Sequence, residues 1–270
     1  MVHPVALFLR TVRARAYPRV IGMRRYPSWI VQEAVLPLLS ISAFAFVYRA
    51  MEAPEQYIGF VILGGAMTAF WLNVLWSIGA QLYWERDTGN LEMYIMAPTS
   101  MMAVLAGMAV GGMVLTLVRA SVILLSGWLL FHISFAPSSW WWLSGVFIVT
   151  LLALYGLGMM FASLFLIGGR ATWHMVNLLQ EPVYLLSGMN FPIRILPAIV
   201  STFAAIIPLS LGMDAMRQLI FVDIEGLLPV RVEAAILFIL SIVFIALAQR
   251  CLVYLERRAR EDGRLTVRWQ

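Results

Sequence analysis

Two charged side chains stand inside hydrophobic runs of the sequence. Arg119 lies near the middle of the apolar run 102–131, and Glu181 lies near the middle of the run 171–190. A charge at the centre of a bilayer costs about 2.5–3.5 kcal/mol on insertion scales, so both residues are functional candidates. Because their depths match, we predict an intramembrane ion pair between Arg119 and Glu181. A structural role and a role in substrate or proton handling both remain open for this pair.

The sequence lacks the residue types that most other chemistry at a protein site needs. All 19 Lys+Arg residues are arginine, the sequence has one cysteine, and its 3 histidines are scattered. A zinc site needs a cluster of thiolates or imidazoles, and a Ser-Lys dyad or a phosphate-binding G-x-x-x-x-G-K-[ST] loop needs a lysine. We therefore predict no catalytic residues, no metal site and no ATPase or cofactor on this chain. An intramembrane hydrolase or a passive channel is the weaker rival class.

The composition is that of a membrane protein. Hydrophobic residues make up 62% of the chain and charged residues 12%, against roughly 45–50% and 25% in soluble domains. The net charge of +5 comes from arginines that collect near the two ends of the chain. Basic charge there holds a membrane protein against anionic lipid, so we expect contact with membrane lipids and not with nucleic acid.

We predict an all-α membrane protein with six transmembrane helices in one domain, 1–270. A spanning helix needs about 20 largely apolar residues. Such runs occur at 29–48, 57–82, 102–131, 140–167, 171–190 and 232–254. Arginines precede the first run and follow the last, so the positive-inside rule places both termini in the cytoplasm, with the chain in a bacterial inner membrane.

The segment 1–25 precedes the first span and has an amphipathic pattern. Apolar residues recur at helical spacing from Val5 to Ala16, while Arg10 and Arg13 occupy the other side. This pattern predicts an interfacial helix that lies in the headgroup plane and ends at Pro18. An anchor and a hinge that transmits motion are both open interpretations.

The loop 84–100, between the second and third spans, carries a short helix pattern. Leu91, Tyr94 and Ile95 fall on one face, and Pro98 ends the helix because its ring cannot continue the hydrogen-bond ladder. A helix this short is marginal alone. Its apolar face therefore either packs on its own bundle or docks in a groove of another protein.

Two blocks of sequence resemble one family. The stretch W-E-R-D-T-G-N-L-E-M-Y-I-M-A-P-T-S at 84–100 is similar to the E-x-G-T-x-E-x-[LIM]-x-x-x-P-[VTL]-[ST] loop of type-2 ABC transporter permeases. It departs at Asn90, where that family commonly has threonine. Between Leu186 and Arg217, the sequence also looks like the family's S-G-x-x-[FY]-P…L-P…P-[LT]…R tail.

This resemblance implies that the loop is a coupling helix on a separate nucleotide-binding ATPase subunit. That partner, in two copies, would bind ATP and Mg, while two copies of this chain, as a homodimer, would form one exporter. The residues assigned to the docking surface are Glu85, Arg86, Gly89, Leu91, Glu92, Tyr94, Ile95 and Pro98.

The segment 191–217, between the fifth and sixth spans, is apolar but interrupted by prolines. A continuous crossing here would give an odd number of spans, so we predict a re-entrant segment at the outer side. Irregular backbone at membrane depth persists only where protein buries it or where it lines water. The resemblance points to an extracellular gate, although a fixed lid is also open. The gate residues are Pro192, Pro197, Pro208 and Arg217.

The resemblance also implies a pathway bordered by the first, second and fifth spans. The wall candidates are Phe70, Asn73, Trp76, Asn177 and Gln180, and ordinary helix packing is their alternative role. Apolar walls with sparse amides favour an amphipathic drug-like or lipid substrate. Export of a lipid-linked glycan or polysaccharide is the alternative.

Overall fold

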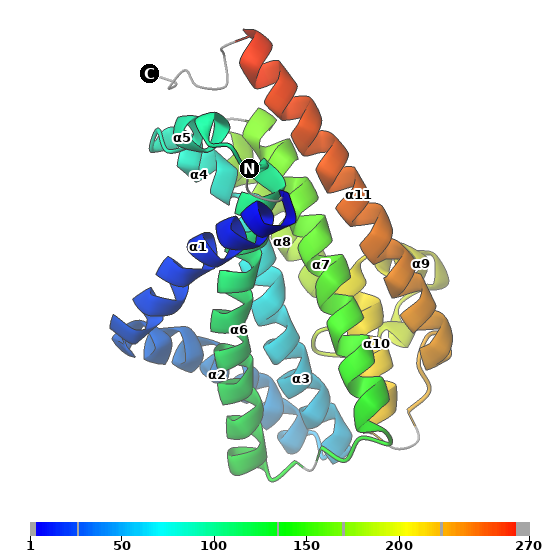
Figure 1. Cartoon of the computed structure of the whole chain (residues 1–270). Helices are drawn as coiled ribbons and strands as arrows, with labels where there is room; N and C mark the ends of the chain where they lie inside the picture. The colour runs from blue at the N-terminus through cyan, green and yellow to red at the C-terminus, as the bar shows by residue number, and fades with distance from the viewer. Residues whose placement is uncertain (1–3, 26, 134, 169–170, 222–223, 263–270) are drawn as a thin grey trace.

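The computed structural model describes residues 4–25, 27–133, 135–168, 171–221 and 224–262, and all regular structure in these residues is helical (Figure 1). The predicted all-α class is therefore confirmed. Arg264 and Arg268, which supported the predicted orientation, lie outside the described residues. The elements are α1 (Pro4–Arg25), α2 (Pro27–Ala50), α3 (Glu55–Leu72), η1 (Asn73–Gly79), α4 (Gln81–Asp87), α5 (Leu91–Met96), α6 (Met101–Phe131), α7 (Trp140–Gly168), α8 (Thr172–Leu186), η3 (Ile193–Ile195), α9 (Ala198–Ala204), α10 (Pro208–Ile220) and α11 (Val230–Asp262).

Four of the described helices are long and apolar enough to cross a membrane. They are Glu55–Asp87, Met101–Phe131, Trp140–Phe165 and Val230–Leu255. The bent pair α9–α10 adds a fifth if it is counted as one span. The chain is thus a multi-pass membrane protein, with four to five candidate spans among its described residues where the sequence predicted six.

The predicted spans 29–48 and 171–190 lie in α2 and α8. In the first, α2 is 24 residues long, Pro27–Ala50, and its crossing stays a prediction. In the second, α8 has 15 residues and so rises about 22 Å, less than the hydrocarbon thickness of about 30 Å. Its polar residues also make α8 amphipathic, unlike a helix that is apolar on all sides.

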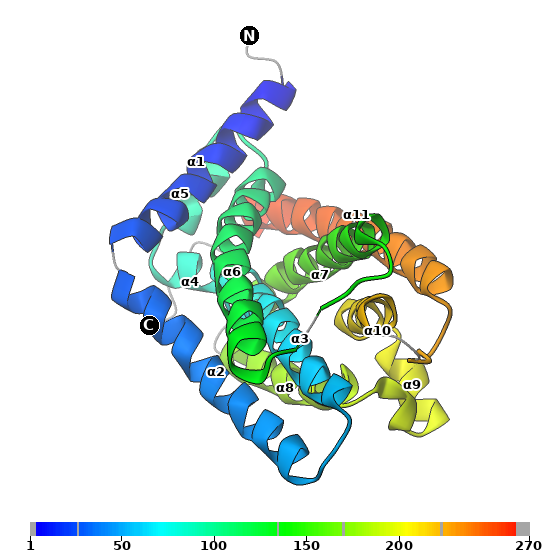
Figure 2. The same cartoon turned by 90° about the horizontal axis from the view of Figure 1, so that it is seen from below.

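The core of the bundle is the long helix formed by α3, η1 and α4. In the most apolar stretch of this helix, 89% of the residues are buried, against 28% for α11. Figure 2 shows α3 and α7 enclosed by α2, α6, α8, α10 and α11. The outward face of α11 carries exposed apolar side chains such as Phe238, Ile239 and Ile242. Such a face suits contact with lipid.

The two ends of the bundle differ. The start of α1, the short helices α4 and α5 and the C-terminal end of α11 lie at one end, and the connection between α6 and α7 lies at the other (Figure 1). Helix α7 begins there with Trp140, Trp141 and Trp142, which are 67%, 90% and 45% exposed. Exposed indoles at this end suit a membrane interface.

The prediction that Pro18 ends the N-terminal helix is wrong, because α1 continues through it to Arg25. Proline removes one backbone hydrogen bond. Packing against α6 offsets this loss: a Cβ added at Gly107 would lie 2.6 Å from the Arg15 Cβ and 2.8 Å from the Val12 carbonyl oxygen. Only a glycine lets the two helices approach this closely, so α1 is a packed element of the bundle.

The outer segment is broken where its prolines stand. Pro192 and Pro197 directly precede η3 and α9, and Pro208 is the first residue of α10, where its missing N–H costs nothing. Helices α9 and α10 meet at an angle of 101°. This bend is the geometry of a re-entrant loop or of a broken span.

Candidate functional site

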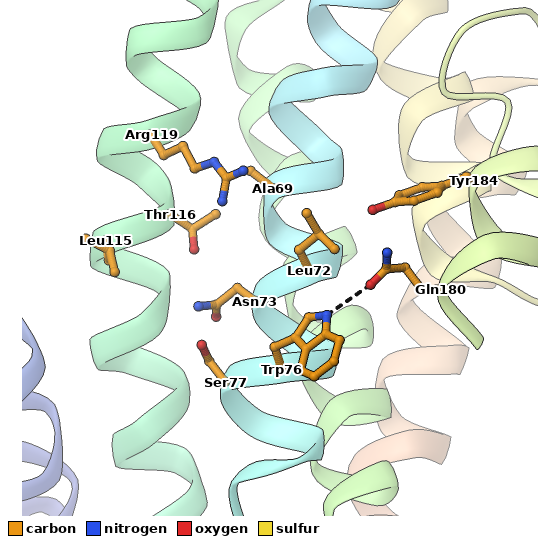
Figure 3. A pocket seen from close by; sticks show the side chains of 10 residues that line it. All are labelled: Ala69, Leu72, Asn73, Trp76, Ser77, Leu115, Thr116, Arg119, Gln180 and Tyr184. Atoms are coloured by element: carbon orange, nitrogen blue, oxygen red, sulfur yellow. Dashed lines mark hydrogen bonds between the residues drawn. The ribbon is translucent and has the colours of Figure 1, made fainter. Parts of the chain in front are cut away.

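A cavity of about 430 Å³ lies between three helical segments near the centre of the bundle (Figure 3). The long central helix, α6 and α8 each contribute to its wall. The lining residues are Ala69, Leu72, Asn73, Trp76, Ser77, Leu115, Thr116, Arg119, Gln180 and Tyr184. Its volume falls within the range of about 300–1,000 Å³ that small-molecule sites occupy.

A π-helix forms one side of this cavity. Residues 73–79 leave the α-helical pattern, and the Ala80 N–H donates to the Leu75 carbonyl oxygen five residues earlier, at 2.9 Å. Asn73, Trp76 and Ser77 of this segment face the cavity. π-Helical turns are rare and occur frequently at functional sites, because the wider turn changes the direction of the side chains.

Two hydrogen bonds fix the polar side chains of the wall. The Trp76 indole N–H donates to Gln180 Oε1 at 2.9 Å and so joins the π-helix to α8. The Tyr155 hydroxyl donates to Asn73 Oδ1 at 3.2 Å. The Trp76 ring also meets Trp173 edge to face, with the ring centroids 4.9 Å apart. The wall is therefore preorganised by its own contacts.

Among the described residues that line the cavity, Arg119 carries the formal charge. Its guanidinium reaches from α6 across toward α3 (Figure 3). Glu181 is exposed and follows Gln180 in α8, whose Nε2 donates to a Glu181 carboxylate oxygen at 3.5 Å. Arg119 and Glu181 both act electrostatically on the Tyr184 hydroxyl. They thus share one neighbourhood, while the direct ion pair stays a prediction.

The predicted wall residues divide into two groups. Asn73, Trp76 and Gln180 line the cavity. Phe70 does not, because it is 1% exposed and packs edge to face on Phe147. Asn177 does not either: it is exposed, and its Nδ2 donates to the Trp173 carbonyl oxygen. Neither residue lines this cavity, and their place in a pathway formed by two copies stays a prediction.

Six lining residues were not predicted from the sequence, namely Ala69, Leu72, Ser77, Leu115, Thr116 and Tyr184. A signal for the polar ones was present in the helical spacing. Ser77 lies four residues after Asn73, Tyr184 four after Gln180, and Thr116 three before Arg119. Residues at these spacings share a helix face.

The end of the bundle that holds α4 and α5 is tied to α1. Arg15 donates to Glu85 Oε1 at 2.8 Å, and Gln81 Nε2 donates to the same oxygen at 2.9 Å. The Arg15 guanidinium also lies 4.7 Å from the centroid of the Tyr94 ring. Burial raises the pKa of Tyr94 to about 12, so this ring stays neutral under the cation.

A second arginine of α1 connects this end to the cavity wall. Arg19 donates to the Ser77 carbonyl oxygen at 2.9 Å, to Gln81 Oε1 at 3.0 Å and to the Met108 carbonyl oxygen at 3.0 Å. Ser77 belongs to the π-helix, so Arg19 contacts the irregular part of the central helix directly. Burial is the largest cause that lowers the pKa of Arg19, and its three acceptors compensate for the desolvation.

The predicted docking surface is partly internal. Leu91, Glu85 and Arg86 are buried within the chain, and Tyr94 and Ile95 are half-buried against the core. The apolar face of α5 therefore packs on its own bundle. Gly89, at φ 81°, forms the turn between α4 and α5. The exposed side chains of this region are Trp84, Asp87, Thr88, Glu92, Met93, Met96, Pro98 and Ser100.

Arg217 holds the outer segment to the central helix. It is 1% exposed and donates to carbonyl oxygens of Gly188 at 2.7 Å, Met189 at 2.9 Å and Phe60 at 3.1 Å. The turn at 188–191 is thereby fixed against α3. On the surface nearby, Arg194 pairs with Glu225, and this hydrogen bond lowers the pKa of the Glu225 carboxyl.

Comparison with known families gives one match. A family model described as ABC-2 type transporter matches residues 16–221, which is more than half of the 270 residues of the chain. The matched range contains the cavity, the α4–α5 loop and the outer segment. A search of curated proteins gives no match.

Proposed function

This chain belongs to the ABC-2 type transporter family, and from that membership we propose that it is the permease subunit of an ATP-driven exporter of an amphipathic drug-like or lipid substrate. The family role of this membrane domain is transport, with ATP hydrolysed elsewhere. Two copies of the chain would form the pathway as a homodimer in a bacterial inner membrane. Two nucleotide-binding subunits, which hold ATP and Mg, would dock on the cytoplasmic side.

The observation that carries this proposal is the connection between the cavity and the α4–α5 loop. Glu85 of α4 contacts Arg15, Gln81 contacts both Glu85 and Arg19, and Arg19 contacts the π-helix at Ser77. A displacement of α4 and α5 therefore reaches the cavity wall through direct contacts. A nucleotide can bias two transporter states only by favouring one of them, and this contact chain supplies the mechanical link.

The size of the cavity favours a small amphiphile over a polymer. A polysaccharide path needs aromatic rings along its whole length, whereas this cavity has two, Trp76 and Tyr184, beside aliphatic and amide groups. A lipid-linked glycan remains the alternative cargo of the same architecture. The outer segment, held by Arg217, would act as the extracellular gate.

The coupling role of α5 is tested by purification of the tagged chain from its native membrane. We expect an ATPase subunit to copurify and to hydrolyse ATP. Glu92→Arg combined with Met96→Asp changes two exposed residues of α5 and should abolish both copurification and hydrolysis. Trp141→Ala, at the opposite end of the bundle, is the matched control and should retain both.

Two outcomes would overturn the proposal. Purified chain that moves cargo uphill with no companion polypeptide would show that energy does not arrive through α5. Retention of the ATPase in the Glu92→Arg, Met96→Asp variant would remove α5 from the interface.

A further inference from the structure

We propose that the cavity beside the π-helix binds the head group of an anionic amphiphile, a phosphate or carboxylate on an apolar chain. This inference rests on the proposed export function and names the chemical class of its substrate. The cavity lies between two candidate membrane spans and the shorter helix α8, and among its described lining residues Arg119 bears a formal charge. A cation in such a weakly polar setting attracts an anion far more strongly than it would in water.

The groups around Arg119 suit the oxygens of an anionic head group. Ser77 and Tyr184 carry hydroxyls, and Asn73 carries an amide whose Oδ1 is already engaged by Tyr155, which leaves Nδ2 as the donor. The Trp76 indole N–H already donates to Gln180, so it is not counted among the donors for a head group. Phosphate and carboxylate accept hydrogen bonds from such donors, and a guanidinium matches their geometry.

The apolar part of the ligand has a wall of its own. Ala69, Leu72 and Leu115 line the same cavity. Leu178 and Leu185 of α8 are 73% and 57% exposed, and they share a different face of α8 from Gln180 and Tyr184. The volume of about 430 Å³ holds a head group and the first part of a chain, so the remainder of the chain would lie outside the cavity.

Glu181 sets how strongly the site prefers an anion. Its carboxylate is outside the lining, but its charge and that of Arg119 act on the same Tyr184 hydroxyl. A negative charge close to the cavity weakens the attraction of the cavity for another anion. Removal of the Glu181 charge should therefore strengthen the preference, and removal of the Arg119 charge should abolish it.

The test compares three probes with one apolar chain and different head groups: dodecyl phosphate, dodecylphosphocholine and dodecyltrimethylammonium. Affinities are measured by calorimetry on the full chain in phosphatidylcholine nanodiscs. The wild type should bind dodecyl phosphate about tenfold more tightly than dodecyltrimethylammonium, which is the scale expected for one weakly screened charge. Ratios between variant and wild type cancel the partitioning of each probe into the membrane.

The variants separate charge from folding. Arg119→Gln should bring the phosphate-to-ammonium preference to about one, and Glu181→Gln should raise it. Gln180→Glu keeps Arg119 and adds a carboxylate to the wall, so it should weaken dodecyl phosphate binding even if Arg119→Gln does not fold. Arg231→Gln removes a charge at an exposed position of α11 and should leave the preference unchanged.

Two results would overturn the inference, and they differ in how much of it they remove. Equal affinity of the wild type for the three probes, or a preference that survives Arg119→Gln, removes the anionic class but leaves a cavity for amphiphiles. Failure of all three probes to bind removes the cavity as a cargo site. In both cases, docking of the ATPase on α5 is judged by its own experiment.

Discussion

Arg217 shows how much of this structure depends on single buried side chains. Its guanidinium donates to backbone carbonyls of the outer turn and of α3, and it lies 4.6 Å from the centroid of the Phe60 ring. Each hydrogen bond from a charged donor contributes about 1.5–3 kcal/mol. Arginine alone offers several donors in one plane, so the position tolerates no other cation well.

We predict that Arg217→Lys lowers the free energy of unfolding by about 2–4 kcal/mol, because lysine keeps the charge but cannot reach three carbonyls in a fixed geometry. Thermal unfolding in detergent, followed by intrinsic fluorescence, measures the effect. Arg231→Lys, at an exposed position, is the control and should unfold with the wild type. An Arg217→Lys variant with the wild-type midpoint would contradict the role assigned here.

At the residue scale, sequence reasoning found polar residues but not their directions. Insertion cost predicted Arg119 as a functional candidate, and Arg119, Asn73 and Gln180 line one cavity, while the predicted pathway role of the two amides stays a prediction. Glu85 was predicted to meet a partner, yet it binds Arg15, which is 70 residues away in sequence. Spacing places residues on a face of a helix, but only packing decides what that face meets.

Among the elements, α1 has contacts that its own pattern does not predict. Its amphipathic pattern predicts a helix in the headgroup plane, which stays a prediction, and the structure adds that α1 packs on α6 and holds α4 and α5 through Arg15 and Arg19. The signal for this lies in another element, since Gly107 and Gly111 open a groove on α6 that only small residues allow. A local pattern in α1 does not contain that information.

Gly107→Ala should destabilise the protein and loosen α1. A methyl group there meets the Val12 carbonyl oxygen at 2.8 Å, so the two helices must separate. The gain of about 1 kcal/mol in helix propensity does not offset that shift. Limited trypsin cleavage within α1 should become faster, because its arginines are released from α6.

Gly145 of α7 offers the matched control, since a Cβ added there meets nothing within 4 Å. Gly145→Ala should leave trypsin cleavage of α1 unchanged and raise the stability by up to about 1 kcal/mol. Equal behaviour of the two variants would show that the close approach of α1 to α6 does not matter.

For the whole molecule, composition predicted the class and hydropathy predicted most of the spans. Runs 57–82, 102–131, 140–167 and 232–254 all lie within long apolar helices. The run 171–190 does not, because apolar content alone does not distinguish a crossing from a shorter amphipathic helix that borders a cavity, as α8 does. The run 29–48 lies in α2, and its crossing stays a prediction. The bend of 101° at α9–α10 lies in the region where the prolines interrupt the sequence.

The predicted orientation has a direct test, because the chain has one cysteine, Cys251. In a Cys251→Ser background, Trp141→Cys should react with a membrane-impermeant maleimide in intact cells. Met93→Cys should react only after permeabilisation, since α5 is expected in the cytoplasm. Both positions are exposed, at 90% and 58%, so burial cannot explain a difference. Labelling of Met93→Cys in intact cells would invert the topology.

The π-helix at 73–79 has one consequence for the shape of the whole chain. An α-helix turns about 100° and rises about 1.5 Å per residue. If this stretch were to regain regular i to i+4 bonding, the register beyond it would slip by one position, and α4 would swivel about its axis. Glu85 would then turn away from Arg15. A change of this one turn between π-helical and α-helical bonding would thus shift α4 by one residue of register relative to the cavity wall, at the end of the molecule where the ATPase subunit is proposed to dock.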